Sequence, residues 1–323
     1  MAKLVFTNHP ALWRTGSDYP KIPLTQVSWD SDPSTPVAYV YFGHVNIDFD
    51  GSSTAYAPPG SGLVGDDDLS NAFEVDKDNN IDRWFGVVAL RPDDPAVVSG
   101  AAKIDQRPEL AHGGKYPVVQ QEANGDPNPG YYVSATPHAS GEAYCQTSYV
   151  DASCVPFGAL SGRFKSLGVA LGDYGLALRH DQTLQSGFYF VDVGGNNYAL
   201  GECSHRVGKD LGGSGRGNRF NNNFPVSFIV FPQSGEQDPQ AIVTESDDQI
   251  AKALRDRLQQ LAAADNADDL ALLMGFNETA PQTQPAGLAK LSAYAADPAN
   301  GTKPRNYDNV AAGLASWGYA ATT

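Results

Sequence analysis

The sequence has few cysteines, no histidines at metal-ligand spacing and no long apolar run. Its three cysteines, Cys145, Cys154 and Cys203, form no CxxC pair, so a structural zinc site is not expected. Cys145 and Cys154 could close a small loop in an oxidising compartment, with buried free thiols as the alternative. Nowhere do 18 apolar residues follow one another, so we expect no membrane-spanning helix.

Basic residues are also scarce, with 22 Lys and Arg against 37 Asp and Glu, for a net charge of −15. This charge repels the phosphates of nucleic acids and of anionic lipids, so we expect no nucleic-acid partner and no membrane insertion. A cationic polymer such as partly deacetylated chitosan would be attracted, over a range that salt limits to about 8 to 10 Å. Many soluble proteins are acidic, so the charge alone is weak evidence for such a substrate.

Turn-forming and aromatic residues are plentiful instead: 33 Gly, 22 Pro, 15 Tyr and 14 Phe. Short apolar segments rich in β-branched and aromatic residues alternate with Gly, Asn or Asp turns, which is typical of β-barrels and sandwiches. A short helix is expected over 203–212. The expected strands lie within residues 37–51, 84–92, 131–137, 154–160, 167–180, 187–195, 197–202 and 225–232.

Both ends of the chain differ from this mainly β body, which we place at residues 37–235. Residues 1–36 predict an N-terminal arm whose only strand-like piece is KIPLTQVSW. From about residue 240 to the end, Ala and Leu dominate, which predicts a small helical appendage over 240–323. Packing or dimerisation is the favoured role for that appendage, with carbohydrate binding as the alternative.

The first helix of this region has two clear signals. Ser246 followed by Gln249 predicts a capping box at its start. Apolar residues then recur at helical spacing, which predicts one buried face. These residues are Ile250, Leu254, Leu258 and Leu261.

Two carboxylates, Asp192 and Glu202, are candidates for cleavage of a glycosidic bond. That reaction needs one carboxylic acid to protonate the leaving oxygen and one carboxylate on the anomeric side, at a fixed separation. Asp192 ends the apolar strand GFYFVDV, and Glu202 follows ten positions later, after a turn and the strand YALG. A hairpin would bring them together only in a suitable register. Taken alone, Asp192 is typical of a turn cap and Glu202 of a first helical turn.

The run around this pair resembles the core of glycoside hydrolase family 75, the chitosanases. Upstream segments match the same family in order: IDFDGSSTAYAP, DDDLSNAF, WFGVVAL, YYVSAT and YVDASCVPF. The resemblance covers roughly residues 37 to 232. Its central features are Gly172-Asp173 leading one strand, Val191-Asp192-Val193-Gly194 ending the next, and Gly201-Glu202-Cys203-Ser204 before a helix.

The resemblance implies a double-psi β-barrel and an inverting hydrolase that needs no cofactor. Asp192 and Glu202 take the places of the family's two essential carboxylates, and we assign Glu202 as general acid and Asp192 as general base. Inversion implies carboxyl groups about 6.5 to 9.5 Å apart. The family typically has Gly before its catalytic Asp and Gly-Pro shortly after it, where this chain has Val191 and then Gly194 and Gly195, which leaves substrate specificity open.

Further residues are assigned to substrate binding. Asp48 and Asp50 alternate onto one strand face and could bind glucosamine ammonium groups, with a solvated strand end or a cation site as the alternative. Tyr56 could stack on a sugar ring, as could Trp84 and Tyr132, although aromatic residues in strands are more often core. The full set is Asp48, Asp50, Tyr56, Asp173 and Ser204.

Other polar features favour structural roles. The charge run at 66–68 is typical of a solvated loop, and His44, His180 and His205 show no ligand spacing. The Gly-rich loop at 212–223 lacks the Lys-Ser/Thr of a phosphate-binding loop and is expected to border the cleft.

Three functions are compatible with the sequence. The first is endo-hydrolysis of β-1,4-linked glucosamine polymers. The second is a peptidoglycan hydrolase, such as a lysin or exported toxin, which would suit an N-terminus without a signal-peptide pattern. The third is a carbohydrate-binding protein without catalysis. We expect a secreted or exported protein, with the cytoplasm as the alternative.

Overall fold

The computed structural model describes residues 2–9, 24–43, 45–77, 81–179, 184–194, 201–215, 226–235 and 245–274. By compactness the chain divides into two units. The first comprises residues 1–47, 156–213 and 222–323, and the second comprises residues 48–155 and 214–221. The domain boundaries expected from the sequence, near residues 36 and 240, stay a prediction.

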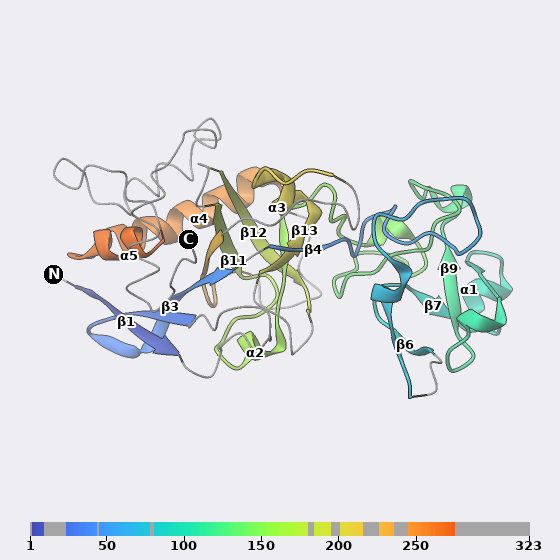
Figure 1. The fold of residues 1–323 in the computed structure, drawn as a ribbon, viewed down its shortest axis with the longest axis horizontal. Coiled ribbons are helices and arrows are strands. Elements are labelled where there is room, and N and C mark those ends of the chain that lie inside the picture. The colour runs from blue at the N-terminus through green and yellow to red at the C-terminus, as the bar shows by residue number, and fades with distance from the viewer. Residues whose placement is uncertain are drawn as a thin grey trace, which may run out of the picture. The chain divides into compact units, whose positions relative to one another are not determined.

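A nine-stranded sheet forms the described part of the first unit (Figure 1). Its strand order is β1-β2-β3-β14-β11-β12-β10-β13-β4, with β1 and β4 at the edges. Neighbouring strands pair antiparallel except β10 and β12, which are parallel, so the sheet is mixed. The strands are β1 (Leu4–His9), β2 (Leu24–Trp29), β3 (Asp32–Gly43), β4 (Asn46–Asp48), β10 (Phe157–Ala159), β11 (Tyr174–Arg179), β12 (Gln185–Asp192), β13 (Glu202–Ser204) and β14 (Val226–Val230).

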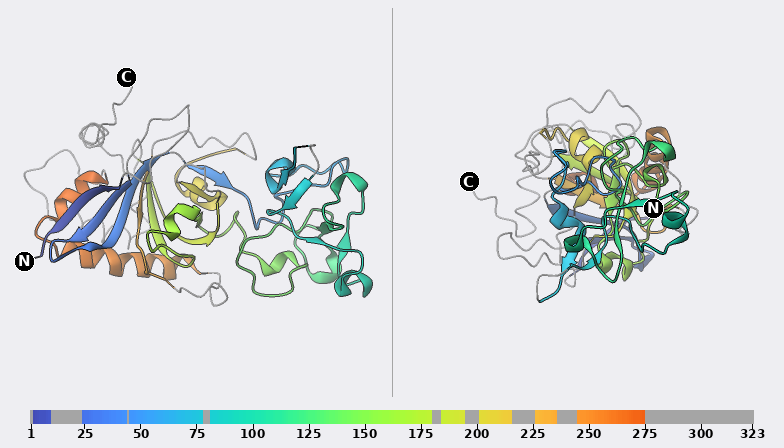
Figure 2. Two further views of the ribbon diagram at one scale, coloured as in Figure 1. Left: turned by 90° about the horizontal axis from the view of Figure 1, so that it is seen from below. Right: turned by 90° about the vertical axis from the view of Figure 1, so that its right-hand side faces the viewer.

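The N-terminal residues belong to this sheet. The strand-like piece KIPLTQVSW contains β2, and β1 pairs with it along its whole length, from Leu4 opposite Trp29 to His9 opposite Leu24. Strand β2 in turn pairs with β3, so the three strands lie side by side (Figure 2). The described part of the first 36 residues therefore contributes β1, β2 and the start of β3 to the same sheet as the rest of the unit.

Glycines fix the packing around the central strand β12. The Phe188 ring lies over Gly175 on β11, its paired residue, and against Gly158 on β10. A Cβ atom at Gly175 would overlap that ring, and one at Gly158 would approach both Phe188 and Phe190 to 3.0 Å. Glycine is thus required at Gly175 and gives the least crowded packing at Gly158, which favours a single register.

Helix α4 (Asp247–Ala262) packs against β11 and β12 of the first unit (Figure 1). Its capping box between Ser246 and Gln249 is present, and its expected apolar face is buried. Gly187 on β12 lies under it, where a Cβ atom would contact the Leu254 side chain at 2.5 Å. The other helices of this unit are α2 (Gly162–Lys165), α3 (His205–Asp210) and α5 (Ala267–Leu273).

The second unit is built mainly from short elements and turns. Its small core consists of Ala102, Ile104, Val118 and Val133, against which partly buried side chains pack. Two small sheets have the orders β5-β6 and β7-β9-β8. The elements are η2 (Leu69–Ala72), β5 (Phe73–Val75), β6 (Ile81–Trp84), β7 (Ala89–Leu90), α1 (Pro95–Val98), β8 (Lys103–Ile104), η3 (Pro108–Leu110), β9 (Tyr116–Val119), η4 (Glu122–Asn124) and η5 (Gln146–Ser148).

The mainly β class expected from the sequence is confirmed, with few helices. The described sheet is open, and no closed barrel occurs among the described residues. Residues 131–137, expected to form a strand, make only isolated bridges, at Tyr131, Tyr132 and Ser134. None of the helices in the described ranges combines the length and apolarity that a bilayer crossing requires.

We expect Leu254→Ala to lower the free energy of unfolding by about 2 to 5 kcal/mol, because it leaves a cavity where a side chain 1% exposed packs on Gly187. Lys252→Ala on the exposed side of the same helix is the control. It removes only an exposed ion pair with Asp256, for a change below about 0.5 kcal/mol. Urea unfolding of the whole protein measures both. Equal losses in the two variants would contradict the packing of α4 on the sheet.

Candidate active site

Strand β10 lies between the two strands that carry Asp192 and Glu202. Asp192 ends β12 and is paired with Ala159, the last residue of β10. On the other side of β10, Gly158 pairs with Cys203, and continuing that antiparallel register by one residue brings Glu202 opposite Ala159. The two acidic residues thus flank Ala159 in one row across three strands. Strands are about 4.8 Å apart, so their Cα atoms are separated by about 10 Å.

This arrangement corrects the hairpin considered from the sequence. The strand ending at Asp192 and the strand beginning at Glu202 are not neighbours, because β10 from an earlier part of the chain is inserted between them. The expected strand YALG lies at residues 198–201, of which 198–200 fall outside the described residues. Spacing along the chain therefore does not bring the carboxylates together, whereas pairing with β10 does.

A β-bulge determines which residue of β12 joins this row. Phe157 pairs with Tyr189 and Gly158 with Phe190, but the register then shifts, so that Ala159 pairs with Asp192 and not with Val191. Directly opposed residues place their side chains on the same face of a sheet, and a one-residue shift changes the face. The bulge thus brings the Asp192 side chain to the face that Ala159 and Glu202 share.

Gly194 closes this row beside the Glu202 carboxylate. A Cβ atom built on Gly194 would overlap Glu202 Oε2 and would lie 3.7 Å from the Ala159 Cβ. Glycine is therefore the only residue that leaves room for the carboxylate in its present place. Asn46 N–H donates to the carbonyl of Gly201 (3.0 Å), which ties the chain entering β13 to the edge strand β4.

The two carboxylates have different surroundings. Asp192 is 7% exposed, and its carboxylate accepts a hydrogen bond from the backbone N–H of Val193. Its own carbonyl accepts from Leu160 N–H (2.7 Å), which holds the end of β12 against the chain that leaves β10. Glu202 is half-buried. Asp192 is therefore the more buried of the two acidic residues.

Asp173, assigned to substrate binding from the sequence, has structural contacts on both oxygens. It is 0% exposed. Its Oδ2 accepts backbone N–H bonds from Ala170 (2.8 Å) and Gln233 (3.1 Å). Its Oδ1 accepts from Ser234 (2.7 Å) and Gly235 (3.2 Å). These bonds join two turns, and the burial leaves no surface for a sugar.

Ser204 likewise has structural partners. It is the N-cap of α3 and accepts a hydrogen bond from Val207 N–H (3.4 Å). The same hydroxyl oxygen accepts from Phe157 N–H at the start of β10 (3.0 Å). Ser204, which is fully buried, therefore joins strand β13, where it lies, to strand β10 and to helix α3. Its substrate-binding assignment stays a prediction.

The remaining assigned residues, Asp48, Asp50 and Tyr56, lie in the second unit. Asp50 N–H donates to Asp48 Oδ1 (2.8 Å), and the Tyr56 hydroxyl donates to Asp50 Oδ1 (2.6 Å). Tyr56 is only 2% exposed, and its burial, with the charges of Asp50 and Asp67, raises its pKa well above the ordinary value. Burial also raises the pKa of Asp67. The Tyr56 hydroxyl thus orients the Asp50 carboxylate, and its buried ring has no exposed face on which a sugar could stack. Asp50 itself is half-buried.

Other sequence expectations divide between structural roles and undescribed residues. Tyr132 is fully buried, and its hydroxyl donates to Asp105 (2.7 Å). Asp66 accepts from the Thr54 hydroxyl, and Asp68 caps η2. All three cysteines are free thiols, so Cys145 and Cys154 are not joined. His44, His180 and residues 216–223 of the Gly-rich loop lie outside the described residues.

Polar contacts that no sequence pattern predicts join the start of the α4 region to the sheet. The Tyr174 hydroxyl donates to both oxygens of the Glu245 carboxylate (2.7 and 2.8 Å), and Glu245 N–H donates to the Tyr189 hydroxyl (3.2 Å). Burial raises the pKa of Glu245 above its usual range. These partners are 56 to 71 residues apart, so no local motif could have indicated them.

Asp173→Asn should lower the free energy of unfolding by about 3 kcal/mol, because an amide cannot accept on both sides and leaves buried N–H groups unsatisfied. Asp248→Asn is the control, because this carboxylate is exposed at the start of α4. It should lower the free energy of unfolding by only a few tenths of a kcal/mol. Thermal unfolding measures the stability, and KM for glucosamine polymer is measured well below the transition. The substrate-binding assignment of Asp173 stays a prediction, and a raised KM with unchanged stability would support it.

Neither a protein-family model nor a curated protein matches the sequence.

Proposed function

We propose that the protein is an endo-acting, inverting glycoside hydrolase that cleaves β-1,4-linked glucosamine polymers such as chitosan. The observation that carries the proposal is the row of Asp192, Ala159 and Glu202, in which two acidic side chains share one sheet face and flank a small residue. Their Cα separation of about 10 Å suits carboxyl groups that hold a water molecule between them. The resemblance to family 75 around the same two residues supports the choice of reaction.

The roles follow from the proposed reaction. Glu202 donates its proton to the glycosidic oxygen as the bond from that oxygen to the anomeric carbon breaks. Asp192 accepts a proton from a water molecule as the water oxygen attacks the anomeric carbon from the opposite side. Glu202 is then ionised and Asp192 protonated, and exchange with solvent restores both.

Charge supports a cationic substrate. The net charge of −15 attracts a polymer of glucosamine ammonium groups, and the Asp48 and Asp50 carboxylates of the second unit are proposed to bind such groups. Because the substrate is an external polymer, we also propose that the protein is secreted or exported. The double-psi barrel remains an expectation from the resemblance, because the strands of the described sheet do not close into a barrel.

Replacing either carboxylate by its amide is the first test. Glu202→Gln and Asp192→Asn should each lower kcat by about 10²- to 10⁴-fold, because each removes one proton-transfer step. Glu109→Gln, an exposed residue of the second unit, is the matched control and should leave kcat unchanged. Reducing-end release from chitosan and from purified peptidoglycan is measured side by side.

The outcomes separate the competing functions. Release from chitosan that depends on both carboxylates supports the proposal, and NMR should show the α-anomer of the new reducing end first. Release from peptidoglycan alone would move the assignment to a murein hydrolase. Undiminished hydrolysis in both amide variants would refute the catalytic pair, and saturable binding without any release would indicate a carbohydrate-binding protein.

Gly194→Ala tests the geometry independently of the charges. The added methyl group overlaps the Glu202 carboxylate and must displace it, and a misplacement of about 1 Å can lower kcat about 10²-fold. In a Glu202→Gln background the same substitution should cost little more, since residues that act as a unit are non-additive. Val193→Ala, one residue away and exposed, is the control. A similar loss in both single variants would point to a general disturbance of the turn.

A further inference from the structure

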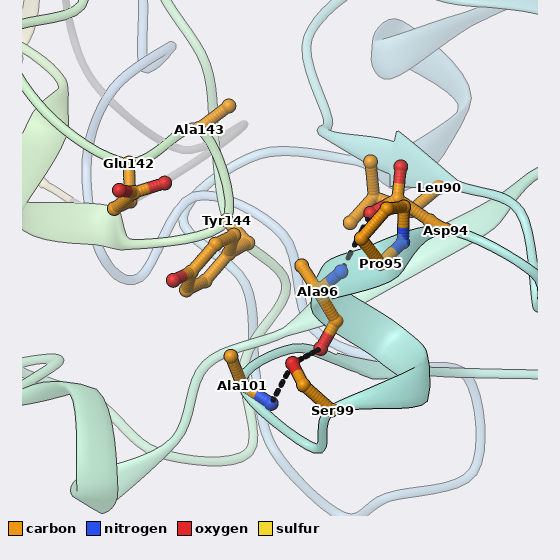
Figure 3. Close-up of a pocket in the computed structure, with 9 residues that line it drawn as sticks. All are labelled: Leu90, Asp94, Pro95, Ala96, Ser99, Ala101, Glu142, Ala143 and Tyr144. Carbon is orange, nitrogen blue, oxygen red and sulfur yellow. Dashed lines mark hydrogen bonds between the residues drawn. The ribbon is translucent and has the colours of Figure 1, made fainter.

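A pocket lies within the second unit, apart from the residues of the proposed reaction (Figure 3). Its volume is about 430 Å³, which falls in the range of roughly 300 to 1,000 Å³ that small-molecule sites occupy. One wall is the loop with Glu142, Ala143 and Tyr144, and the other is helix α1 with the turn that follows it. Both walls and the floor belong to one compact unit.

Tyr144 gives this pocket an aromatic wall. It is half-buried and packs against the small core of the unit, which fixes the ring. Among the described residues no hydrogen bond engages its hydroxyl. A fixed aromatic side chain that lines an open pocket, with apolar neighbours such as Leu90 and Ala101, can receive the apolar face of a sugar ring.

The charged groups of the pocket are all negative. Glu142 is exposed, and across the described chain its carboxylate makes no hydrogen bond or ion pair. Asp94 lies on the opposite wall, where one oxygen caps α1 by accepting from Ala96 N–H (2.9 Å). No Lys or Arg lines the pocket. The complementary ligand is therefore a cation with an apolar ring face, which is the chemistry of a glucosamine residue.

Backbone and side-chain bonds hold both walls in place before any ligand arrives. The carbonyl of Glu142 accepts from the Ser148 hydroxyl (2.7 Å), and the carbonyl of Ala143 accepts from the Tyr149 hydroxyl (2.7 Å). On the other wall, the Ser99 hydroxyl donates to the carbonyl of Ala96 (3.1 Å). A preformed site needs little ordering on binding, which favours affinity.

We propose that this pocket is a second binding site for glucosamine residues of the polymer, with the sugar ring on Tyr144 and its ammonium group at Glu142. The identity of the ligand rests on the proposed function, but the site itself is independent of Asp192 and Glu202. Such a site retains a long polymer on the protein between cleavage events and has no part in bond breaking.

Binding is measured by calorimetry in the full chain carrying Glu202→Gln, titrated with a glucosamine hexasaccharide. Adding Tyr144→Ala or Glu142→Gln should remove one class of site, or weaken its Kd about tenfold, which corresponds to loss of one ring contact or one charge contact. The fully N-acetylated hexasaccharide should bind the pocket poorly, because it has no ammonium group. Phe85→Ala and Glu109→Gln are the aromatic and acidic controls, exposed residues of the same unit outside the pocket.

A kinetic measurement separates this site from the reaction. With Glu202 intact, Glu142→Gln should leave kcat on a short soluble oligosaccharide unchanged and raise KM for long polymer. Unchanged binding in both pocket variants, or an equal loss in the two controls, would overturn the pocket. Pocket-dependent binding in a protein that cleaves no chitosan would overturn the proposed reaction and leave the binding site standing. Cleavage that depends on Glu202, without any binding that depends on Tyr144, would support the proposed reaction and overturn the second binding site.

Discussion

The Phe188 ring, packed over Gly175 and against Gly158, is the contact on which the rest of the proposed site depends. It holds β12 in register between β11 and β10, because a Cβ atom at Gly175 would overlap the ring and one at Gly158 would crowd it at 3.0 Å. A slip of one residue would place a Cβ atom under the ring and would turn every side chain of β12 to the other face. With this register fixed, the bulge that follows brings Asp192 opposite Ala159.

The sequence predicts the elements of this arrangement better than their pairing. Alternation and turn residues indicated β11, β12 and β14, and the spacing of apolar residues with the Ser246 cap indicated α4. Neither pattern predicts that β10 lies between β12 and β13, because pairing between strands that are distant in the chain produces no periodic pattern in the local sequence. The β-bulge in β12 cannot be predicted from the sequence either, since one extra residue does not change the composition of the strand.

Site residues follow the same division. The resemblance named Asp192 and Glu202, and the register gives them a shared face. It also named Asp173 and Ser204, but their partners are backbone N–H groups of nearby turns and strands. A carboxylate that holds a turn and a carboxylate that meets a substrate are identical in sequence. Asp173 differs in that backbone N–H groups from two turns bind both of its oxygens, and these contacts depend on the tertiary fold.

Helix α4 and the residue preceding its cap, Glu245, are linked to the row of carboxylates through two polar connections. The Glu245 carboxylate accepts a hydrogen bond from the hydroxyl of Tyr174, the first residue of β11, which pairs with the strand that ends at Asp192. At the start of α4, Asp247 pairs with Arg206 (2.7 Å), the second residue of α3 after the Ser204 cap.

These links connect the row of the proposed site to residues past the limit of the resemblance. The same Ser204 that begins α3 also binds β10, so α4 supports the segment that carries Glu202 through α3 and the segment that carries Asp192 through β11. Burial of Leu254 on Gly187 supplies the apolar part of the same contact. The helix is therefore part of the framework that sets the separation of the two carboxylates, and a chain ending near residue 235 would lose that support.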